Sequence, residues 1–285
     1  MGLPAFLRVA TCNLRVRRSL DATVGRIAEL LQAASADGAH VLALPEAALP
    51  GYDADIIART PSTAIDGAES AIRATCRDLA IGCVFGRPRD GFNEAVVVDE
   101  GGDVVARQPK LQLVPTDAPW TTRRGSRQVV FPVRGVPCAA IICHDKRYPE
   151  LVRLPVMAGA RVIFYLSCET YHDDAPLPSK AEEWPEDRMA AELGAYAAQT
   201  AARAVENGVF VVKANVAAPH SHGASSIVGP TGVALGVSDA RGEAVLTRDL
   251  ALADARAPYA RKALDLAYAH SAAWRAMLAS SVDVI

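Results

Sequence analysis

The stretch VPCAAIICHDKRYPE, residues 136–150, is the most informative part of the chain because its character changes abruptly at Cys143. An apolar run ends on this thiol, and four polar or charged residues, HDKR, follow at once. A buried structural cysteine needs no such setting. A nucleophile does, because it must lie at the exposed end of a rigid element among groups that favour its thiolate. The sequence therefore predicts a strand that delivers Cys143 to a reactive position.

Strands and helices are predicted to alternate on both sides of this stretch. Hairpins are expected over residues 94–111, 128–143 and 225–236, and helices over about 20–36 and 66–80. The strands are continuously apolar, which indicates burial on both faces. Hairpins mixed with strand–helix–strand units favour an α/β fold with two mixed β-sheets packed face to face and helices outside.

Length and composition limit the classes of protein that fit. No linker, repeat or low-complexity segment divides the 285 residues, so we expect one domain over 1–285, with a core at about 5–252 and a C-terminal helical extension at about 253–285. The net charge of −2 gives no electrostatic footprint for nucleic acid or a membrane surface. Targeting and membrane-spanning patterns are missing. Six single cysteines without a CxxC pair favour reduced thiols in the cytoplasm over a zinc site.

Three reactive groups follow predicted strands, namely Glu46, Lys110 and Cys143. Loops at the carboxyl ends of strands in α/β folds converge on a crevice, so these groups are expected to meet. A carboxylate, an ammonium and a thiol suffice for acyl transfer: the carboxylate takes the thiol proton, and the ammonium holds an oxyanion. A nearby lysine is expected to lower the pKa of the thiol. Each residue alone also has an ordinary structural interpretation.

The sequence around these residues resembles the nitrilase superfamily of carbon–nitrogen hydrolases, in its amidase-like branch. Five segments match the motifs of that family in order across about residues 7–250: LPEAALPGY (44–52), PKLQLVP (109–115), CHDKRYPE (143–150), RAVENGVFVVKAN (203–215) and GASSIVGPTG (223–232). The resemblance implies a four-layer α-β-β-α sandwich and a Glu–Lys–Cys triad, carried by Glu46, Lys110 and Cys143. It also implies an oxyanion site at the backbone N–H of His144.

Further residues acquire expected roles from the resemblance. Asp145, Arg147 and Glu150 are expected to brace the turn after Cys143 by hydrogen bonds and ion pairs. Tyr52, Lys146 and Cys168 are expected to contact substrate; Lys146 could instead face solvent, or together with Arg147 hold a substrate carboxylate, as adjacent basic residues do in relatives that cleave N-carbamoyl amino acids.

One departure from the family pattern concerns the second glutamate that many members carry after the lysine. No glutamate occurs between Lys110 and Cys143, and Asp117 is the nearest carboxylate that can substitute for it. His220 and His222 lack an evident third ligand and are interpreted as a polar loop, so no metal is expected. His172, Asp173 and Asp174 are interpreted as the start of a loop that covers the pocket.

The predicted function is thiol-dependent hydrolysis of small non-peptide amides through a cysteine thioester, with release of ammonia or an amine. No cofactor is expected. The alternatives are N-carbamoyl cleavage, acyl transfer to another acceptor, a catalytically silent scaffold and, less favoured, a nitrile substrate. The resemblance also implies a homodimer or a larger homo-oligomer that acts on a small molecule.

Overall fold

The computed structural model describes residues 3–17, 19–170, 186–218, 221, 223–255 and 271–285. Its strands are β1 (Phe6–Leu14), β2 (Val41–Ala43), β3 (Gly82–Arg89), β4 (Phe92–Val98), β5 (Val104–Pro109), β6 (Gln128–Val133), β7 (Val136–Ile142), β8 (Val162–Leu166), β9 (Phe210–Val216), β10 (Ser226–Val228), β11 (Ala234–Val237), β12 (Val245–Ala251) and β13 (Val282–Val284). Its helices are α1 (Leu20–Ala36), α2 (Ala54–Arg59), α3 (Ser62–Leu79), the 3₁₀ helix η1 (Cys143–Arg147), α4 (Glu150–Met157), α5 (Glu186–Asn207) and α7 (Ser271–Ser281).

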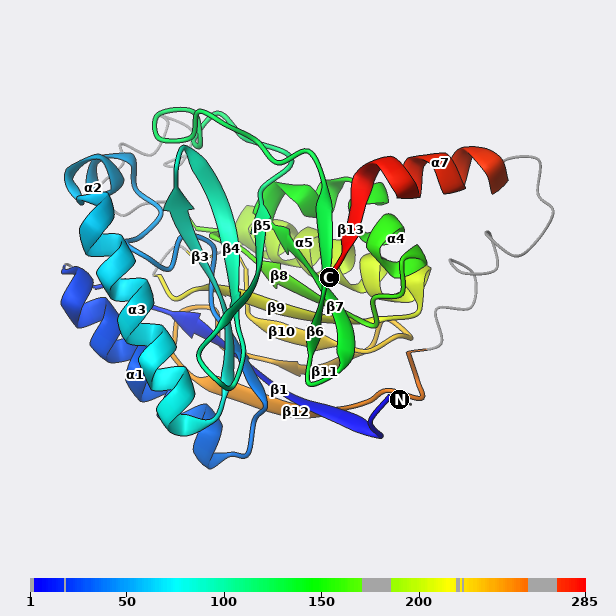
Figure 1. Ribbon diagram of the computed structural model, residues 1–285, viewed down its shortest axis with the longest axis horizontal. Coiled ribbons are helices and arrows are strands. Elements are labelled where there is room, and N and C mark those ends of the chain that lie inside the picture. The colour runs from blue at the N-terminus through cyan, green and yellow to red at the C-terminus, as the bar shows by residue number, and fades with distance from the viewer. Residues whose placement is uncertain (1–2, 18, 171–185, 219–220, 222, 256–270) are drawn as a thin grey trace.

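The strands form one curled, mixed sheet in the order β13-β6-β7-β8-β9-β1-β2-β3-β4-β5 (Figure 1). Its central strands run parallel, and the three predicted hairpins, β4–β5, β6–β7 and β10–β11, are antiparallel as expected. Only two residue pairs, Asn13 with Asn215 and Leu14 with Val216, join β1 to β9. The mixed α/β class is therefore confirmed. Because hydrogen bonds run through this narrow junction, the division into two separate sheets stays a prediction.

Three apolar clusters account for the burial of the strands. One contains residues from both halves of the curled sheet, among them Val84 of β3, Val97 of β4, Cys138 of β7 and Phe164 of β8. A second lies between α1, α3 and the strands β1 to β4. The third lies between α4, α5 and the strands β6 to β10. The strands are thus covered on both faces, which explains their continuous apolar runs.

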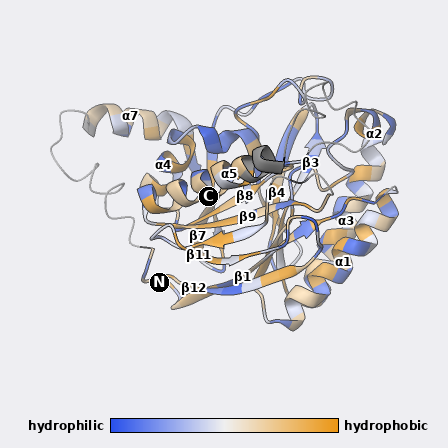
Figure 2. Ribbon diagram, turned by 180° about the vertical axis from the view of Figure 1, so that it is seen from behind, coloured by the Kyte–Doolittle hydropathy of each residue, from blue (hydrophilic) through white to orange (hydrophobic). Residues whose placement is uncertain are grey.

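The helices on the outside follow from their own sequences. The predicted helix over 20–36 is confirmed as α1; the side chain of Ser19 caps it by accepting a hydrogen bond from Ala22 N, and Ile27 and Leu31 face the core. Helix α3 begins four residues before the predicted position 66, directly after Pro61. Figure 2 shows hydrophobic residues along the inner strands and a mixture of hydrophobic and hydrophilic residues on α1 and α3. This mixture is typical of helices with one buried face.

The described part of the C-terminal extension differs from the purely helical expectation. Helix α7 packs through Trp274 and Leu278 against the cluster under α4 and α5. The chain then adds β13, which pairs in parallel with β6 at the edge of the sheet (Figure 1). Residues 271–285 therefore cover the core of their own chain. The sequence also predicts that Leu264, Leu266 and Tyr268 of this extension pack on a neighbouring subunit or on their own core, and these residues lie outside the described ones.

Candidate active site

The first two predicted reactive groups meet in a buried ion pair. Glu46 lies three residues beyond β2, Lys110 follows β5 directly, and their side chains are inaccessible to solvent. Lys110 Nζ lies 2.7 Å from Glu46 Oε1, and Asn93 Nδ2 donates to the same oxygen at 2.8 Å. Glu46 Oε2 is buried and has no hydrogen-bond partner among the described residues. One carboxylate oxygen is thus held in place, and the other is available to a reacting group.

A glycine in the neighbouring strand fixes the position of Glu46. Gly86 N in β3 donates to Pro45 O at 3.0 Å, which brings the two backbones together. A methyl group on Gly86 would lie 2.7 Å from the Cα of Glu46, closer than atoms normally approach. Ala47, directly after Glu46, has a positive φ of 45°. The close approach at Gly86 therefore sets the turn that aims Glu46 at Lys110.

Asp117 reaches the lysine in spite of its short side chain. Its Oδ2 lies 2.8 Å from Lys110 Nζ and accepts a hydrogen bond from Val114 N at 2.8 Å. Tyr52 OH donates to Asp117 Oδ1 at 2.7 Å. Asp117 thus lies where the sequence analysis expects a supporting carboxylate, and its catalytic role stays a prediction. Tyr52, expected to contact substrate, is held by Asp117.

The charges around Lys110 keep it an ammonium. Burial alone would lower the pKa of Lys110, but the charges of Glu46, Cys143 and Asp117 raise that pKa above its ordinary value. Burial also raises the pKa of Glu46, and the charge of Lys110 opposes this shift only in part. Lys110 is therefore shared between two carboxyl groups, those of Glu46 and Asp117.

Cys143 lies at the junction of β7 and η1 with a positive φ of 45°, a conformation that non-glycine residues rarely adopt. It is partly exposed, whereas Cys12, Cys76, Cys83 and Cys138 are buried. Burial of the thiol group and the charge of Glu46 raise its pKa to about 12, and Lys110 lowers it only in part. Lys110 thus lowers the thiol pKa as expected, but burial and the charge of Glu46 outweigh its effect. The thiol is protonated at neutral pH and needs a base to become a nucleophile.

The turn after Cys143 is braced by one of the three residues expected to do so. Asp145 is buried, and its carboxylate accepts hydrogen bonds from Ile142 N at 3.0 Å and Gln112 N at 2.8 Å. Arg147 and Glu150 are exposed and form no hydrogen bond or ion pair within the described part of the chain. The bracing role is thus confirmed for Asp145 and stays a prediction for the other two. His144, whose N–H is the predicted oxyanion donor, lies next in the turn and places its ring against Tyr148.

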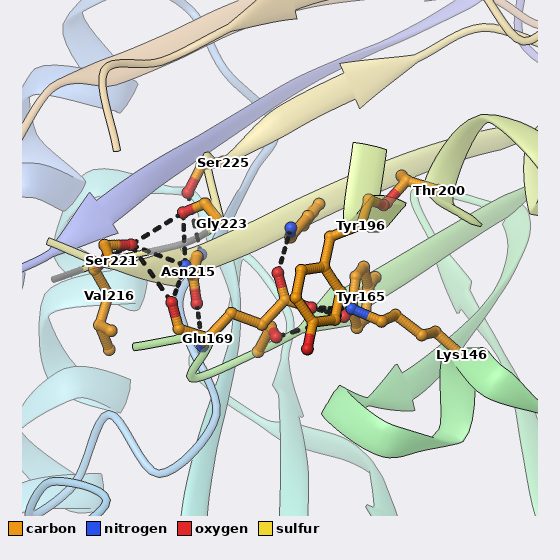
Figure 3. A network of polar contacts seen from close by, with 12 residues as sticks. Lys146, Tyr165, Glu169, Tyr196, Thr200, Asn215, Val216, Ser221, Gly223 and Ser225 are labelled. Atoms are coloured by element: carbon orange, nitrogen blue, oxygen red, sulfur yellow. Dashed lines mark hydrogen bonds and ion pairs between the residues drawn. The ribbon is translucent and has the colours of Figure 1, made fainter. Parts of the chain in front are cut away.

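A second charged cluster contains Lys146 and Glu169, and Figure 3 shows the polar contacts around it. Lys146, which could have faced solvent, is buried and forms an ion pair with Glu169 Oε1. Lys213 Nζ lies 2.5 Å from Glu169 Oε2, and Tyr165 OH donates to Oε1. Asn215 Oδ1 accepts the backbone N–H of Glu169 at 2.7 Å. Both lysines thus bond to the one carboxylate of Glu169, and burial lowers the pKa of Lys146 to about 8.

Charges from both clusters act on Cys143. Glu46 and Glu169 raise the pKa of its thiol, burial being the larger cause, whereas Lys110 and Lys146 lower it. Cys168, expected to contact substrate, is partly exposed and lies one residue before Glu169. After burial, the charges of Glu46 and Cys143 are the main causes that raise its pKa. The structure therefore brings all the predicted site residues to one region around Cys143.

Sequence reasoning missed Asn93, Glu169 and Lys213. Glu169 follows β8 by three residues, so the rule that singled out Glu46 and Cys143, a reactive group after a strand, applies to it equally. Lys213 interrupts the apolar strand β9, whereas Asn93 lies beside Glu94 at the start of β4. A polar residue inside an apolar run was the signal that could have found Lys213.

The described residues show neither a metal-binding group nor a membrane-spanning helix. Within them, no group of three His, Cys, Asp or Glu side chains could hold a metal ion. His172, Asp173, Asp174, His220 and His222 lie outside the described residues. None of the helices in the described ranges is long and apolar enough to cross a membrane.

Known proteins share this sequence pattern and fold. The family model for carbon–nitrogen hydrolases matches residues 8–259. The chain is 30% identical to the "Hydrolase in agr operon" of Staphylococcus lugdunensis over 142 residues, which cover 48% of this chain and 53% of that protein. It is 27% identical to the 2-oxoglutaramate amidase of Bacillus subtilis (strain 168) over 183 residues, 62% of this chain and 63% of that protein. The matches thus span only about half to two thirds of these two relatives.

The structural comparison extends over nearly the whole chain. A nitrilase-superfamily amidase from Nesterenkonia sp. AN1 superposes with a TM-score of 0.73 and 26% identity, over 92% of this chain and 98% of that one. Another structure of that amidase shows covalent addition of the acetamide moiety of fluoroacetamide at its active-site cysteine. The predicted resemblance is therefore confirmed: the chain belongs to the carbon–nitrogen hydrolases of the nitrilase superfamily and is amidase-like, an enzyme family that acts on C–N bonds.

Proposed function

We propose that this protein hydrolyses small non-peptide amides through a thioester on Cys143. The observation that carries the proposal is the buried carboxylate of Glu46, with Oε1 held by Lys110 and Asn93 and Oε2 without a partner among the described residues. A carboxylate with one oxygen fixed and one free can take a proton from a neighbouring thiol. Cys143 needs such a base because its pKa, raised by burial, is about 12.

The proposed first half-reaction transfers the acyl group to sulfur. Glu46 takes the proton of Cys143 as the thiolate attacks the amide carbon. The ammonium of Lys110 and the backbone N–H of His144 stabilise the oxyanion that develops on the carbonyl oxygen. Glu46 then returns its proton to the leaving nitrogen, the C–N bond breaks, and ammonia or an amine departs.

The second half-reaction releases the acid. Water enters beside the thioester, and Glu46 takes its proton as the oxygen attacks the acyl carbon. The C–S bond then breaks, and Cys143 regains its proton from Glu46. Asp117 contributes by holding Lys110 at 2.8 Å, opposite Glu46, so that the ammonium stays at the oxyanion position.

The relatives support an amide over a nitrile or an N-carbamoyl substrate. The structural neighbour is an amidase whose cysteine takes up an acetamide moiety, and one relative in sequence is a 2-oxoglutaramate amidase. The oligomeric state, the location in the cytoplasm and the four-layer α-β-β-α arrangement belong to the same proposal. Three apolar clusters, one inside the curled sheet and one under each helical face, support the four layers.

Ammonia release from a panel of amides, N-carbamoyl amino acids and nitriles tests the proposed substrate class. We expect release from amides, and a fall of about a thousandfold or more in Cys143→Ala. Cys138→Ala, which removes a buried thiol from the strand that leads to Cys143, is the matched control and should retain activity. Release from the N-carbamoyl compounds or nitriles alone would replace amides by that class, and no release from any compound would favour a catalytically silent protein.

A further inference from the structure

Glu69 on α3 is the centre of a buried ion network that the proposed chemistry does not use. Arg87 Nη1 of β3 lies 2.5 Å from Glu69 Oε2, and Arg107 of β5 donates to Glu69 Oε1. Arg107 Nη1 also lies 2.6 Å from Glu94 Oε1 of β4. The side chains of Glu69, Arg87 and Glu94 are at most 7% exposed. One carboxylate of a helix is thus joined to three neighbouring strands.

The charges of this network hold its members in place. Burial opposes the ionisation of Glu69, but its contacts with Arg107 and Arg87 lower its pKa below the ordinary value of a glutamate. Arg87 Nε also donates to Pro88 O at 3.1 Å, which uses a further donor of the same guanidinium. Separation of any of these pairs would leave a charge without its partner in the interior, and this is costly. The network therefore fixes β3, β4 and β5 relative to α3.

Strand β4 connects the network to the candidate active site. Successive residues of a strand point to opposite faces of the sheet. The side chain of Asn93 accordingly reaches Glu46, and that of the next residue, Glu94, reaches Arg107. The backbone oxygen of Asn93 also accepts a hydrogen bond from Lys110 N at 2.7 Å. A shift of Glu94 would therefore displace both groups that hold Glu46.

Strands β3 and β5 follow the same pattern. Gly86, whose close approach fixes the backbone of Glu46, directly precedes Arg87 in β3. Lys110, the partner of Glu46, comes three residues after Arg107 of β5. Each of the three strands thus carries one charged residue of the network and, within three positions of it, one residue that holds the proposed base.

We propose that Glu69 is a positioning residue for amide hydrolysis: through Arg87 and Arg107 it fixes β3, β4 and β5 so that Glu46 keeps its orientation. This inference rests on the proposed function and adds to it a residue on α3. Glu69 does not touch the substrate or the reacting atoms. It acts on the rate because a general base must be held in one geometry to take a proton efficiently.

Glu69→Gln tests the proposal, since it keeps the shape of the side chain and removes its charge. Looser strands should weaken the contacts of Asn93 and Lys110 with Glu46, and both contacts oppose the effect of burial on the pKa of Glu46. That pKa should rise, so the acid limb of the kcat/KM profile for ammonia release should move to higher pH. We expect kcat to fall about 10-fold and KM to change less than about twofold.

The sign of the shift separates positioning from long-range electrostatics. Loss of the negative charge of Glu69 without any movement would favour the ionised form of Glu46 and lower its pKa, so the acid limb would move to lower pH. A merely structural role would reduce stability and leave the limb in place. Either of these two results in the folded variant would overturn the proposal.

Asp66→Asn is the matched control. Asp66 lies on the same helix and accepts from the same Arg87 at 2.7 Å, but its side chain is 60% exposed. Water can replace such an exposed partner, so kcat and the acid limb should stay unchanged. An equal shift in Asp66→Asn and Glu69→Gln would show that burial of Glu69 has no special effect, which contradicts the proposal.

Arg107→Lys replaces Glu69→Gln if the latter does not fold. A lysine keeps the positive charge but lacks the planar fork with which Arg107 reaches Glu69 and Glu94 together. The acid limb should move in the same direction and less far. A limb that stays in place in folded Arg107→Lys would contradict the proposal.

Urea unfolding tests the same coupling without turnover, and so separates this inference from the proposed function. If the network holds Asn93 against Glu46, loss of Asn93 costs less stability once Glu69 is neutral. The effect of Glu69→Gln with Asn93→Ala on the unfolding equilibrium should be smaller than the product of the single effects by about 3-fold or more. Multiplicative effects would overturn the positioning role, whereas absence of ammonia from every amide with the wild type would contradict the proposed function itself.

Discussion

Lys110 Nζ and Glu46 Oε1 lie 2.7 Å apart in a site that excludes solvent from both side chains. Such a pair is fixed in place by the cost of separating its charges, so it holds the carboxylate in one orientation. The second oxygen of Glu46 has no partner among the described residues. The pair thus combines a rigid support with one free proton acceptor, which is what a general base requires.

Glu46→Gln should stop hydrolysis and, at the same time, make the thiol of Cys143 easier to ionise. Without a base, ammonia release should fall by about a thousandfold or more. Burial is the main cause that raises the pKa of Cys143, and Glu46 is the next, so the variant should have a lower thiol pKa than the wild type. The pH dependence of iodoacetamide alkylation measures this. An unchanged or raised midpoint would show that Glu46 does not act on Cys143.

Asn93→Ala should impair Glu46 as a base, although Asn93 itself is not expected to contact the substrate. Asn93 Nδ2 donates to Glu46 Oε1 at 2.8 Å, and this hydrogen bond opposes the effect of burial, which raises the pKa of Glu46. Its loss should raise that pKa further, so the acid limb of the kcat/KM profile should move to higher pH. We expect kcat to fall about 10-fold, typical of a misplaced general base. A purely structural role would lower stability and leave the acid limb in place.

Gly86→Ala should destabilise the protein and lower its activity together. Its new methyl group would lie 2.7 Å from Glu46 Cα, and neither backbone can move freely in the core. We expect the free energy of unfolding to fall by about 1–3 kcal/mol, as for overpacked cores. Gly67→Ala in α3 is the matched control: its methyl group would meet nothing within 4 Å, so a gain of about 0.5–1 kcal/mol is expected. Urea unfolding measures both, and equal effects would contradict the close approach.

Acid should weaken the cluster around Glu169. Burial opposes its ionisation, but the charges of Lys213 and Lys146 hold its pKa at about 2, below the ordinary value of a glutamate. The ionised carboxylate therefore stabilises the fold above about pH 4.3, and this stabilisation is lost as the pH falls towards 2. The free energy of unfolding of the wild type should fall over this range by about 3 kcal/mol more than that of Glu169→Gln. Parallel curves for the two proteins would contradict the assignment.

Local patterns predicted a large part of the fold and of the site. The hairpins follow from apolar runs around turn residues such as Gly101 and Gly102, and those runs pair with their neighbours in the chain. Glu46, Lys110 and Cys143 could be predicted for the same reason. Each follows a strand (β2, β5 or β7) that can be recognised from one short segment of sequence.

Other features depend on contacts between distant segments and could not be predicted. The junction of β1 with β9 joins residues about two hundred positions apart through two pairs. The direction of the Cys143 pKa shift depends on how deeply the turn is buried, and the spacing of residues along the sequence does not reveal this. Glu169 and Lys213 meet only because β8 and β9 are neighbours in the sheet.

The most direct test of the account is the mass of the peptide that contains Cys143 after acid quenching during amide turnover. We predict an increase that equals the acyl group of the amide supplied, lost on treatment with hydroxylamine and missing from Cys143→Ala. The same variant should release no ammonia above background. Undiminished ammonia release by Cys143→Ala, or turnover with the acyl group on another residue, would contradict the thioester mechanism.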